Sequence, residues 1–190
     1  MYPVFPLNIV VLPDESVALH LFEPRYRQLY KDVKAGQEFA IVYQDKSNRS
    51  SHGTLVFIDK VINEFPDDTV DLIVRGLSVI KVTTFHDLFP GKLYSGVDAE
   101  VITHENQRVT DELLVEFKKY LTTVGKRHNP SNALSLFQIA NRLELSQEKK
   151  NEFIKCQDCI HMNRFLINEI RFFLKIYEQE KNLNHKFHLN

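Results

Sequence analysis

The sequence has little cysteine, no long apolar run and almost no net charge, and each absence narrows the possible functions. Two Cys in 190 residues are typical of a reducing compartment rather than of a disulfide scaffold. No stretch of about 18 uncharged apolar residues exists, and the N-terminus lacks the basic start of a signal peptide, so we expect a cytoplasmic chain without a membrane span. A net charge of -1 argues against an extended nucleic-acid footprint, because such surfaces usually carry a basic excess.

The motifs of common catalytic and nucleotide sites are also missing. The sequence contains no G-x-x-x-x-G-K-[ST] phosphate loop, no G-x-G-x-x-G fingerprint, no G-x-S-x-G elbow and no H-E-x-x-H zinc motif. Cys156 and Cys159 form a CxxC pair with His161 nearby, but a zinc site would need a fourth ligand and a second pair is missing. We therefore interpret both cysteines as ordinary thiols and expect no metal and no cofactor.

Residues 1–103 have the pattern of a β-sheet lobe. Short runs rich in β-formers are separated by turn residues, of which Pro66-Asp67-Asp68 is the plainest. The runs do not alternate with helical segments, so they predict an antiparallel sheet or small barrel. The predicted strands cover residues 4–7, 9–12, 17–22, 39–43, 54–58, 61–65, 70–74, 77–85 and 94–102.

Residues 104–190 have the pattern of a helical bundle of about four helices. Apolar residues recur at helical spacing from Leu113 to Val124, and Ser131, Ser146 and Asp158 are suitable N-caps for three further helices. Nine of the thirteen residues from 165 to 177 are apolar, which is more than one helix face needs. This last helix is therefore expected at the centre of the bundle, and the alternative is that its extra face meets a partner.

A strand is expected to run directly into a helix between Val17 and Arg27. Glu23 stands at the N-cap position and Pro24 at the first helical position, where its missing N–H costs nothing. The predicted short helix covers residues 24–35, and Gly36 ends it. This junction brings a carboxylate, two guanidinium groups and several aromatic rings together.

The same region resembles the N-terminal substrate-recognition (LON) domain of the bacterial Lon protease. The resemblance is carried by Phe5-Pro6-Leu7, by Val10-Val11-Leu12-Pro13 and by the run from Leu19 to Arg27, and in weaker form it covers nearly the whole chain. Asp14 and Ser78-Val79 depart from the family pattern. The resemblance implies an α+β fold, with a six-stranded PUA-like antiparallel pseudo-barrel followed by a helical bundle. It also implies a free-standing form without the ATPase or Ser-Lys protease modules, and hence no enzymatic activity.

The leading functional hypothesis is therefore a non-catalytic module that binds unfolded or exposed apolar segments of other polypeptides. We expect a shallow groove where barrel and bundle meet, with aromatic rings giving contact area and charged groups holding peptide backbone or carboxylates. In the alternative, structural interpretation, Glu23 caps its helix, Arg25 or Arg75 pairs with it, and Tyr26 packs under the barrel. The candidate binding residues are Phe22, Glu23, Arg25, Tyr26, Tyr30 and Arg75.

Two other functions are considered. An enzyme could use His20 and Glu23 as an acid–base pair, although residues three apart on a strand point to opposite faces, and a lone His among apolar neighbours is more often a hydrogen-bonded core residue. An RNA-binding protein is suggested by the PUA-like barrel, but fold analogy is a weak argument and the near-neutral charge opposes it. A weak homodimer is left open.

Overall fold

The computed structural model describes residues 1–33, 36–46, 48–103, 108–126 and 134–187. The chain divides into two compact units, each of which is described by itself. The first unit contains residues 1–103 together with residues 145–155, and the second contains residues 104–144 and 156–190.

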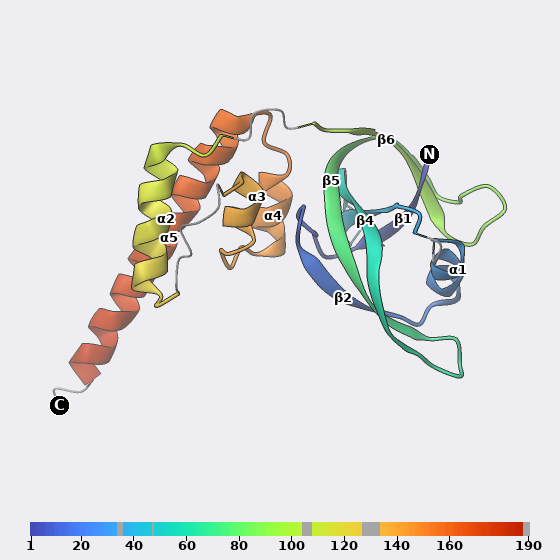
Figure 1. Ribbon diagram of the computed structural model, residues 1–190, viewed down its shortest axis with the longest axis horizontal. Coiled ribbons are helices and arrows are strands. Elements are labelled where there is room, and N and C mark those ends of the chain that lie inside the picture. Colours follow the sequence, from blue (N-terminus) through green and yellow to red (C-terminus); the bar gives the residue numbers. More distant parts are fainter. Residues whose placement is uncertain (34–35, 47, 104–107, 127–133, 188–190) are drawn as a thin grey trace. The chain divides into compact units, whose positions relative to one another are not determined.

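The first unit contains six strands, drawn in Figure 1. They are β1 (Tyr2–Leu7), β2 (Ser16–Leu21), β3 (Phe39–Asp45), β4 (Asn48–Glu64), β5 (Val70–His86) and β6 (Ser95–Val101). Five of them pair in a closed ring that runs β5–β4–β3–β1–β6 and returns to β5, while β2 pairs with β5 alone.

The predicted six-stranded barrel is confirmed, but the sheet is mixed rather than wholly antiparallel. β1 and β3 pair in parallel, from Val4 opposite Ala40 to Leu7 opposite Tyr43. The reason is that β2 and a helix separate these two strands in sequence, and this long connection returns the chain to the starting end of β1.

Fewer and longer strands form than the sequence pattern predicts. The runs 54–58 and 61–65 merge into one strand, β4, which ends at Glu64. A register shift between Ile58 and Lys60 carries its pairing with β5 through the polar residues between the two runs. The runs 70–74 and 77–85 likewise merge into β5 across Gly76, where a Cβ would lie 2.1 Å from the carbonyl oxygen of Leu12. The predicted strand at 9–12 is wrong, because Val10, Val11 and Leu12 are buried without joining the sheet.

The helix α1 (Pro24–Val33) follows β2 almost directly, as the sequence indicates. The backbone N–H groups of Tyr26 and Arg27 both donate to the carbonyl of Glu23, at 3.0 Å. The predicted end at residue 35 lies outside the described residues, and Gly36 has the left-handed φ of +88° expected after a helix. The buried side chains of this helix, which join the barrel core, are Tyr26, Leu29, Tyr30 and Val33.

A second helix, α4 (Gln147–Phe153), belongs to the barrel unit although the sequence pattern groups it with the C-terminal helices. The Val10 N–H donates to Gln147 Oε1 at 2.7 Å, and Ser50 Oγ donates to Asn151 Oδ1 at 2.7 Å. Lys150 also pairs with Glu15. These hydrogen bonds join α4 to residues about a hundred positions earlier, which periodicity alone cannot reveal.

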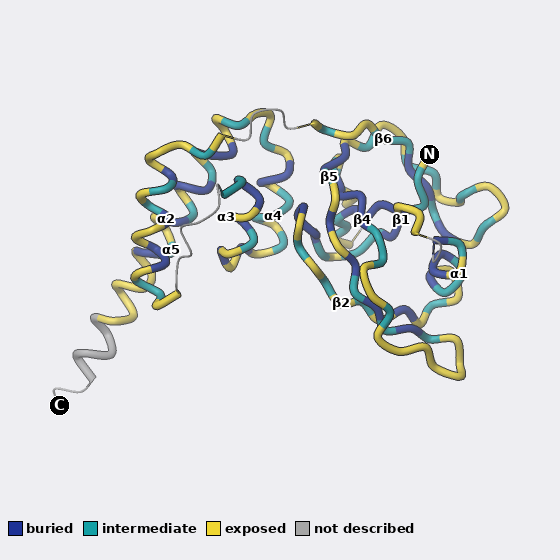
Figure 2. Tube along the Cα trace, in the orientation of Figure 1, coloured by how far each residue is buried: buried dark blue, intermediate teal, exposed yellow. Residues whose placement is uncertain are grey.

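The second unit is built from α2 (Asp111–Thr123), α3 (Leu136–Ala140) and α5 (Cys159–Phe187). α2 and α5 lie side by side, and buried residues follow their facing sides (Figure 2). Ser135 is the N-cap of α3, whereas the predicted cap Ser131 lies outside the described residues. Phe172 on α5 remains 57% exposed, and none of the described helices is long and apolar enough to cross a membrane.

Candidate functional site

Three rings gather at the end of β2, and we call His20, Phe22 and Phe65 the aromatic surface. Phe22 is 61% exposed and Phe65 is 41% exposed, so both are large apolar groups in contact with solvent. The His20 ring stacks on Phe22 with 5.9 Å between centroids and meets the edge of Phe65 at 6.5 Å. The His20 ring therefore connects two exposed phenylalanines into one cluster.

The turn after β4 places Phe65 beside β2. Asp67 accepts hydrogen bonds from the backbone N–H of Thr69 at 3.1 Å and from its hydroxyl at 2.7 Å, and these bonds lower the pKa of Asp67. Asp68 has a left-handed φ of 64°, which a turn residue of this type tolerates. The predicted turn is therefore formed, and it brings β5 back so that its first residues pair with β2.

α1 fixes the same turn from the other side. Arg27 Nη1 donates to the carbonyl oxygen of Asp67 at 2.5 Å, and Lys31 forms an ion pair with Asp68 at 3.2 Å. The turn is therefore held at two points by a helix whose own apolar face is buried in the barrel. The aromatic surface is built on a rigid support.

His20 is hydrogen-bonded, but it lies on the surface rather than in the core. Its Nδ1 is 2.7 Å from Asp71 Oδ1 across the β2–β5 pair, and its side chain is 54% exposed. The hydrogen bond from His20 lowers the pKa of Asp71, against a smaller effect of desolvation. The structure does not bring His20 and Glu23 together as an acid–base pair, because each is engaged with a different partner.

The predicted charged residues form two separate pairs, one at the junction of β2 and α1 and one at the start of β2. Arg25 pairs with Glu23 at 2.8 Å and also lies over the ring of Tyr26, 4.4 Å from its centroid. Arg75 pairs with Asp14 at 3.2 Å instead of with Glu23. All four charged side chains are between 38% and 53% exposed, so solvent screens these pairs and the charges can still meet a ligand.

The two predicted tyrosines lie beneath the surface. Tyr26 is 4% exposed and packs on Phe5 with 3.7 Å between ring centroids, and burial raises the pKa of its hydroxyl. Tyr30 is 3% exposed and its hydroxyl donates to Glu64. Both rings therefore hold α1 against the barrel, and of the predicted aromatic residues only Phe22 offers contact area.

Phe65 and the contacts of His20 were not predicted as parts of the site. The sequence shows the turn at residues 66–68, but it does not show that β2 and the start of β5 would be neighbours.

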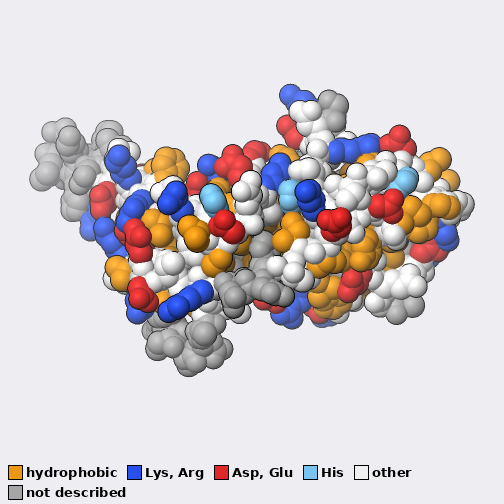
Figure 3. Space-filling view, turned by 90° about the horizontal axis from the view of Figure 1, so that it is seen from above, with side chains coloured by type: hydrophobic (Ala, Val, Ile, Leu, Met, Phe, Trp, Pro, Cys, Tyr) orange, Lys and Arg blue, Asp and Glu red, His pale blue; other side chains and the backbone are white. Residues whose placement is uncertain are grey.

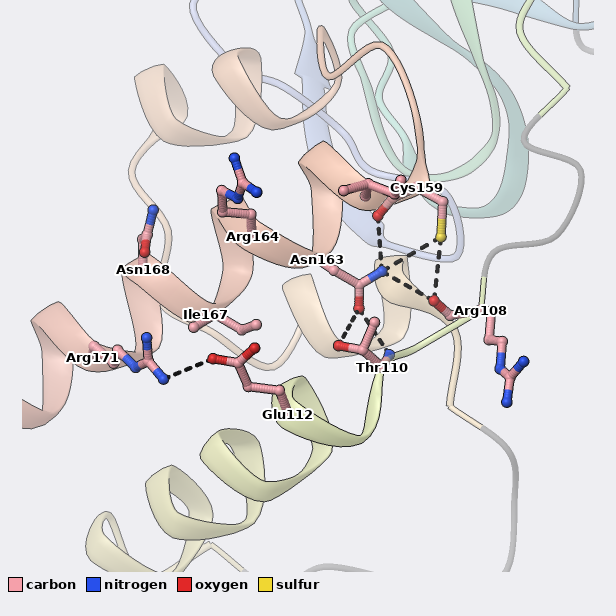
Figure 4. A pocket seen from close by; sticks show the side chains of 10 residues that line it. Arg108, Thr110, Glu112, Cys159, Asn163, Arg164, Ile167, Asn168 and Arg171 are labelled. Atoms are coloured by element: carbon pink, nitrogen blue, oxygen red, sulfur yellow. Dashed lines mark hydrogen bonds and ion pairs between the residues drawn. The ribbon is translucent and has the colours of Figure 1, made fainter.

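The second unit contains a pocket of about 540 Å³ between α2 and α5 (Figure 4). Asn163 points from α5 into the start of α2, where its Oδ1 accepts from the backbone N–H of Thr110 at 2.9 Å. Its Nδ2 donates to the carbonyl oxygens of Arg108 at 3.0 Å and Cys159 at 2.8 Å. The Asn163 side chain is 4% exposed, and both its amide oxygen and its amide nitrogen are hydrogen-bonded. It therefore fixes the backbone at the start of α2 and has no free polar atom for chemistry.

The first unit has a pocket of about 590 Å³ beside the N-terminus of the chain. Tyr94 donates its hydroxyl to Asp32 at 2.7 Å, and Lys92 pairs with the same carboxylate at 2.9 Å. Burial and this hydrogen bond raise the pKa of Tyr94, and the two donors lower the pKa of Asp32 against the opposing effect of burial. A tyrosine held protonated beside a paired carboxylate is not a poised acid or base.

Cys156, Cys159 and His161 do not come together as ligands. The thiol of Cys159 donates to the Arg108 carbonyl at 3.2 Å, and His161 bonds to Asp158 at 2.8 Å. Among the residues that the structure describes, no group of three or more His, Cys, Asp or Glu side chains could hold a metal ion.

The ring of strands with one added edge strand, followed by a helical unit, makes this an α+β protein with a PUA-like barrel. Residues 1–171 match the family model described as the ATP-dependent protease La (LON) substrate-binding domain, so the chain belongs to that family. The comparison with curated protein sequences gave no match.

Two solved structures share the fold at low sequence identity. A Lon N-terminal domain protein from Xanthomonas campestris is 20% identical, with a TM-score of 0.66, 87% of this chain covered and 94% of that one. The N-terminal domain of a Mycobacterium avium complex Lon protease is 16% identical, with a TM-score of 0.63, 90% of this chain covered and 97% of that one.

Proposed function

We propose that the chain is a non-catalytic module that binds exposed apolar segments of unfolded polypeptides through the aromatic surface. The observation that carries this proposal is the exposure of Phe22 and Phe65 on a support held by α1. Clusters of exposed large apolar side chains, unlike single ones, are typical of sites that meet another protein. Membership of a substrate-binding domain family supports the same reading.

The chemistry of the surface suits a ligand that is apolar but variable in sequence. Two rings offer area without a narrow pocket, so many leucine, valine or phenylalanine side chains can pack on them. The Glu23–Arg25 pair, which directly follows Phe22 in the chain, provides exposed donors and acceptors for peptide groups, whereas the Arg75–Asp14 pair lies at the opposite end of β2. Such a site has no need of a nucleophile or a metal.

A binding titration with paired variants tests the proposal. We expect a reduced, carboxymethylated and therefore unfolded model protein to bind the native chain, with affinity falling about 10-fold or more for the Phe22→Ser, Phe65→Ser double variant. Phe172→Ser is the matched control, because Phe172 is 57% exposed but lies on α5. If the native chain does not bind at tens of micromolar, the proposed function is refuted. If the double variant and the control lose affinity equally, the assignment of the binding site to the aromatic surface is refuted.

The RNA-binding alternative gains no support from the surface charge. On the face drawn in Figure 3, basic and acidic side chains are interspersed instead of being gathered by sign. Arg25, Arg49 and Arg75 each pair with a carboxylate, which lowers the local positive field.

A further inference from the structure

β2 pairs with the sheet along one side only. Its six residues pair with β5 from Ser16 opposite Arg75 to Leu21 opposite Val70. In an antiparallel pair, alternate residues direct their N–H and C=O groups away from the partner strand. Among the described residues, no hydrogen bond reaches the backbone of Ser16–Leu21 from that outer side. A regular row of backbone donors and acceptors is therefore available.

This edge has none of the features that usually protect an edge strand. Natural sheets guard such strands with lysine, proline or a bulge, and the sequence Ser-Val-Ala-Leu-His-Leu has neither residue. The β2–β5 register also runs without a shift, whereas the β4–β5 and β5–β6 pairs are interrupted by bulges. The pairing of β2 is therefore regular over all six residues, without a bulge that would turn its edge away from a neighbour.

The edge leads directly to the aromatic surface. Ser16, Ala18 and His20 are exposed on one face of β2, and Phe22 follows the strand on that same alternation. A segment lying along β2 would therefore pass small, uncharged side chains before reaching the rings of His20 and Phe22. Neither charge nor bulk on β2 opposes it.

We propose that β2 binds its ligand as an added strand, so that an extended, unfolded polypeptide segment of about six residues is recognised through its backbone. This inference rests on the proposed function and specifies its ligand: an extended chain with an apolar side chain at the Phe22 end. Backbone pairing makes no demand on most of the ligand's sequence, and this tolerance is what a module for unfolded polypeptides requires. The aromatic surface then fixes where along the ligand the pairing starts.

The test uses two labelled ten-residue peptides of identical sequence, with serine and threonine alternating with leucine and phenylalanine. One peptide is unmodified, and the other is N-methylated at every interior residue, which removes backbone donors but keeps the side chains. We expect fluorescence anisotropy to show at least 10-fold weaker binding of the methylated peptide. In NMR hydrogen exchange, we expect the unmodified peptide to slow exchange at alternate amides of residues 16–21.

The outcomes distinguish a failure of the proposed function from a failure of the added-strand inference. If neither peptide binds at tens of micromolar, the proposed function fails and this inference fails with it. If both bind equally, or if β2 amides stay unprotected while the peptide binds, the added strand is refuted and the aromatic surface alone is the site. If β2 amides become protected with rising protein concentration in the absence of peptide, the edge pairs with a second copy of the chain, which also refutes the inference.

Discussion

Gly76 shows how a single residue can determine the path of a strand. A Cβ at this position would lie 2.1 Å from the carbonyl oxygen of Leu12 and 2.8 Å from its carbonyl carbon. The Gly76 N–H also donates to the carbonyl of Glu15, and its own carbonyl accepts from Asp14. The residue thus lets the loop before β2 lie directly against β5.

We predict that Gly76→Ala lowers the free energy of unfolding by roughly 3 kcal/mol, because the added methyl group would collide with the backbone of Leu12 and Pro13, which cannot turn away as a flexible side chain could. Gly91→Ala is the control: nothing lies within 4 Å of its Cβ, and its φ of 71° leaves a strain of only about 1 kcal/mol. Urea unfolding followed by circular dichroism measures both. Equal effects of the two substitutions would contradict the contact with Leu12 as the cause of the larger loss.

Asn163 gives a second prediction at this scale. Asn163→Leu would leave the Thr110 N–H without its acceptor and would remove the side-chain donor to the carbonyls of Arg108 and Cys159, so we expect the free energy of unfolding to fall by about 2–3 kcal/mol. The exposed Asn168, one and a half turns along the same helix, should tolerate Asn168→Ala within about 0.5 kcal/mol. Thermal unfolding distinguishes the two, and similar melting temperatures would contradict the structural role.

At the scale of the element, β2 is attached to β5 through backbone pairing and one hydrogen-bonded cross-strand pair of side chains. His20 and Asp71 face each other in the β2–β5 register, and Asn63 lies 3.4 Å from the same carboxylate. Because the strand belongs to the sheet on one side only, this pair matters more to β2 than a similar pair would to a central strand.

We predict that Asp71→Asn reduces the loss of stability in acid. The pKa of Asp71 is lowered in the folded state. The carboxylate therefore contributes its full share to the free energy of unfolding above pH 3.8, the ordinary pKa of Asp, and this share is lost as the pH falls through the lower pKa of the folded state. Urea midpoints measured at neutral pH and below 3.8 should therefore differ less in the variant than in the native chain. Asp59→Asn, at an exposed carboxylate of β4, is the control, and an unchanged acid dependence in Asp71→Asn would contradict the assignment.

The sequence predicted elements better than it predicted their partners. Strand and helix positions follow from local alternation and capping, so α1 begins at Pro24 and α4 follows Ser146 as expected. The parallel β1–β3 pair and the merging of runs into β4 and β5 depend on pairing between distant residues. For the same reason Phe22 could be nominated as a surface residue, but its neighbour Phe65 could not.

At the scale of the whole molecule, α4 shows that the order of the chain and the organisation of the fold differ. Lys150 pairs with Glu15 while only 11% of the lysine side chain and 21% of the glutamate side chain are exposed. Glu15 also accepts from the backbone N–H of Leu12 at 2.8 Å. A contact in this position connects the helix to the loop that precedes β2.

We predict that Lys150→Met destabilises the protein by about 1–2 kcal/mol, because it leaves Glu15 partly buried without its cation. Lys149→Met should have a smaller effect, since the Lys149–Glu152 pair is 42% and 58% exposed. Hydrogen exchange should also become faster in residues 147–153 of the Lys150 variant. A variant as stable as the native chain would show that α4 does not depend on this ion pair.

The chain leaves the first unit near residue 103 and re-enters it at residue 145, before the second unit is finished. A ribosome must therefore make most of the protein before the N-terminal barrel receives its last helix. Until then Val10 and Ser50 lack the hydrogen-bond partners that α4 supplies, and the side of the nascent barrel that α4 will cover is exposed to solvent. Maturation of this lobe consequently follows the synthesis of the segment that interrupts it.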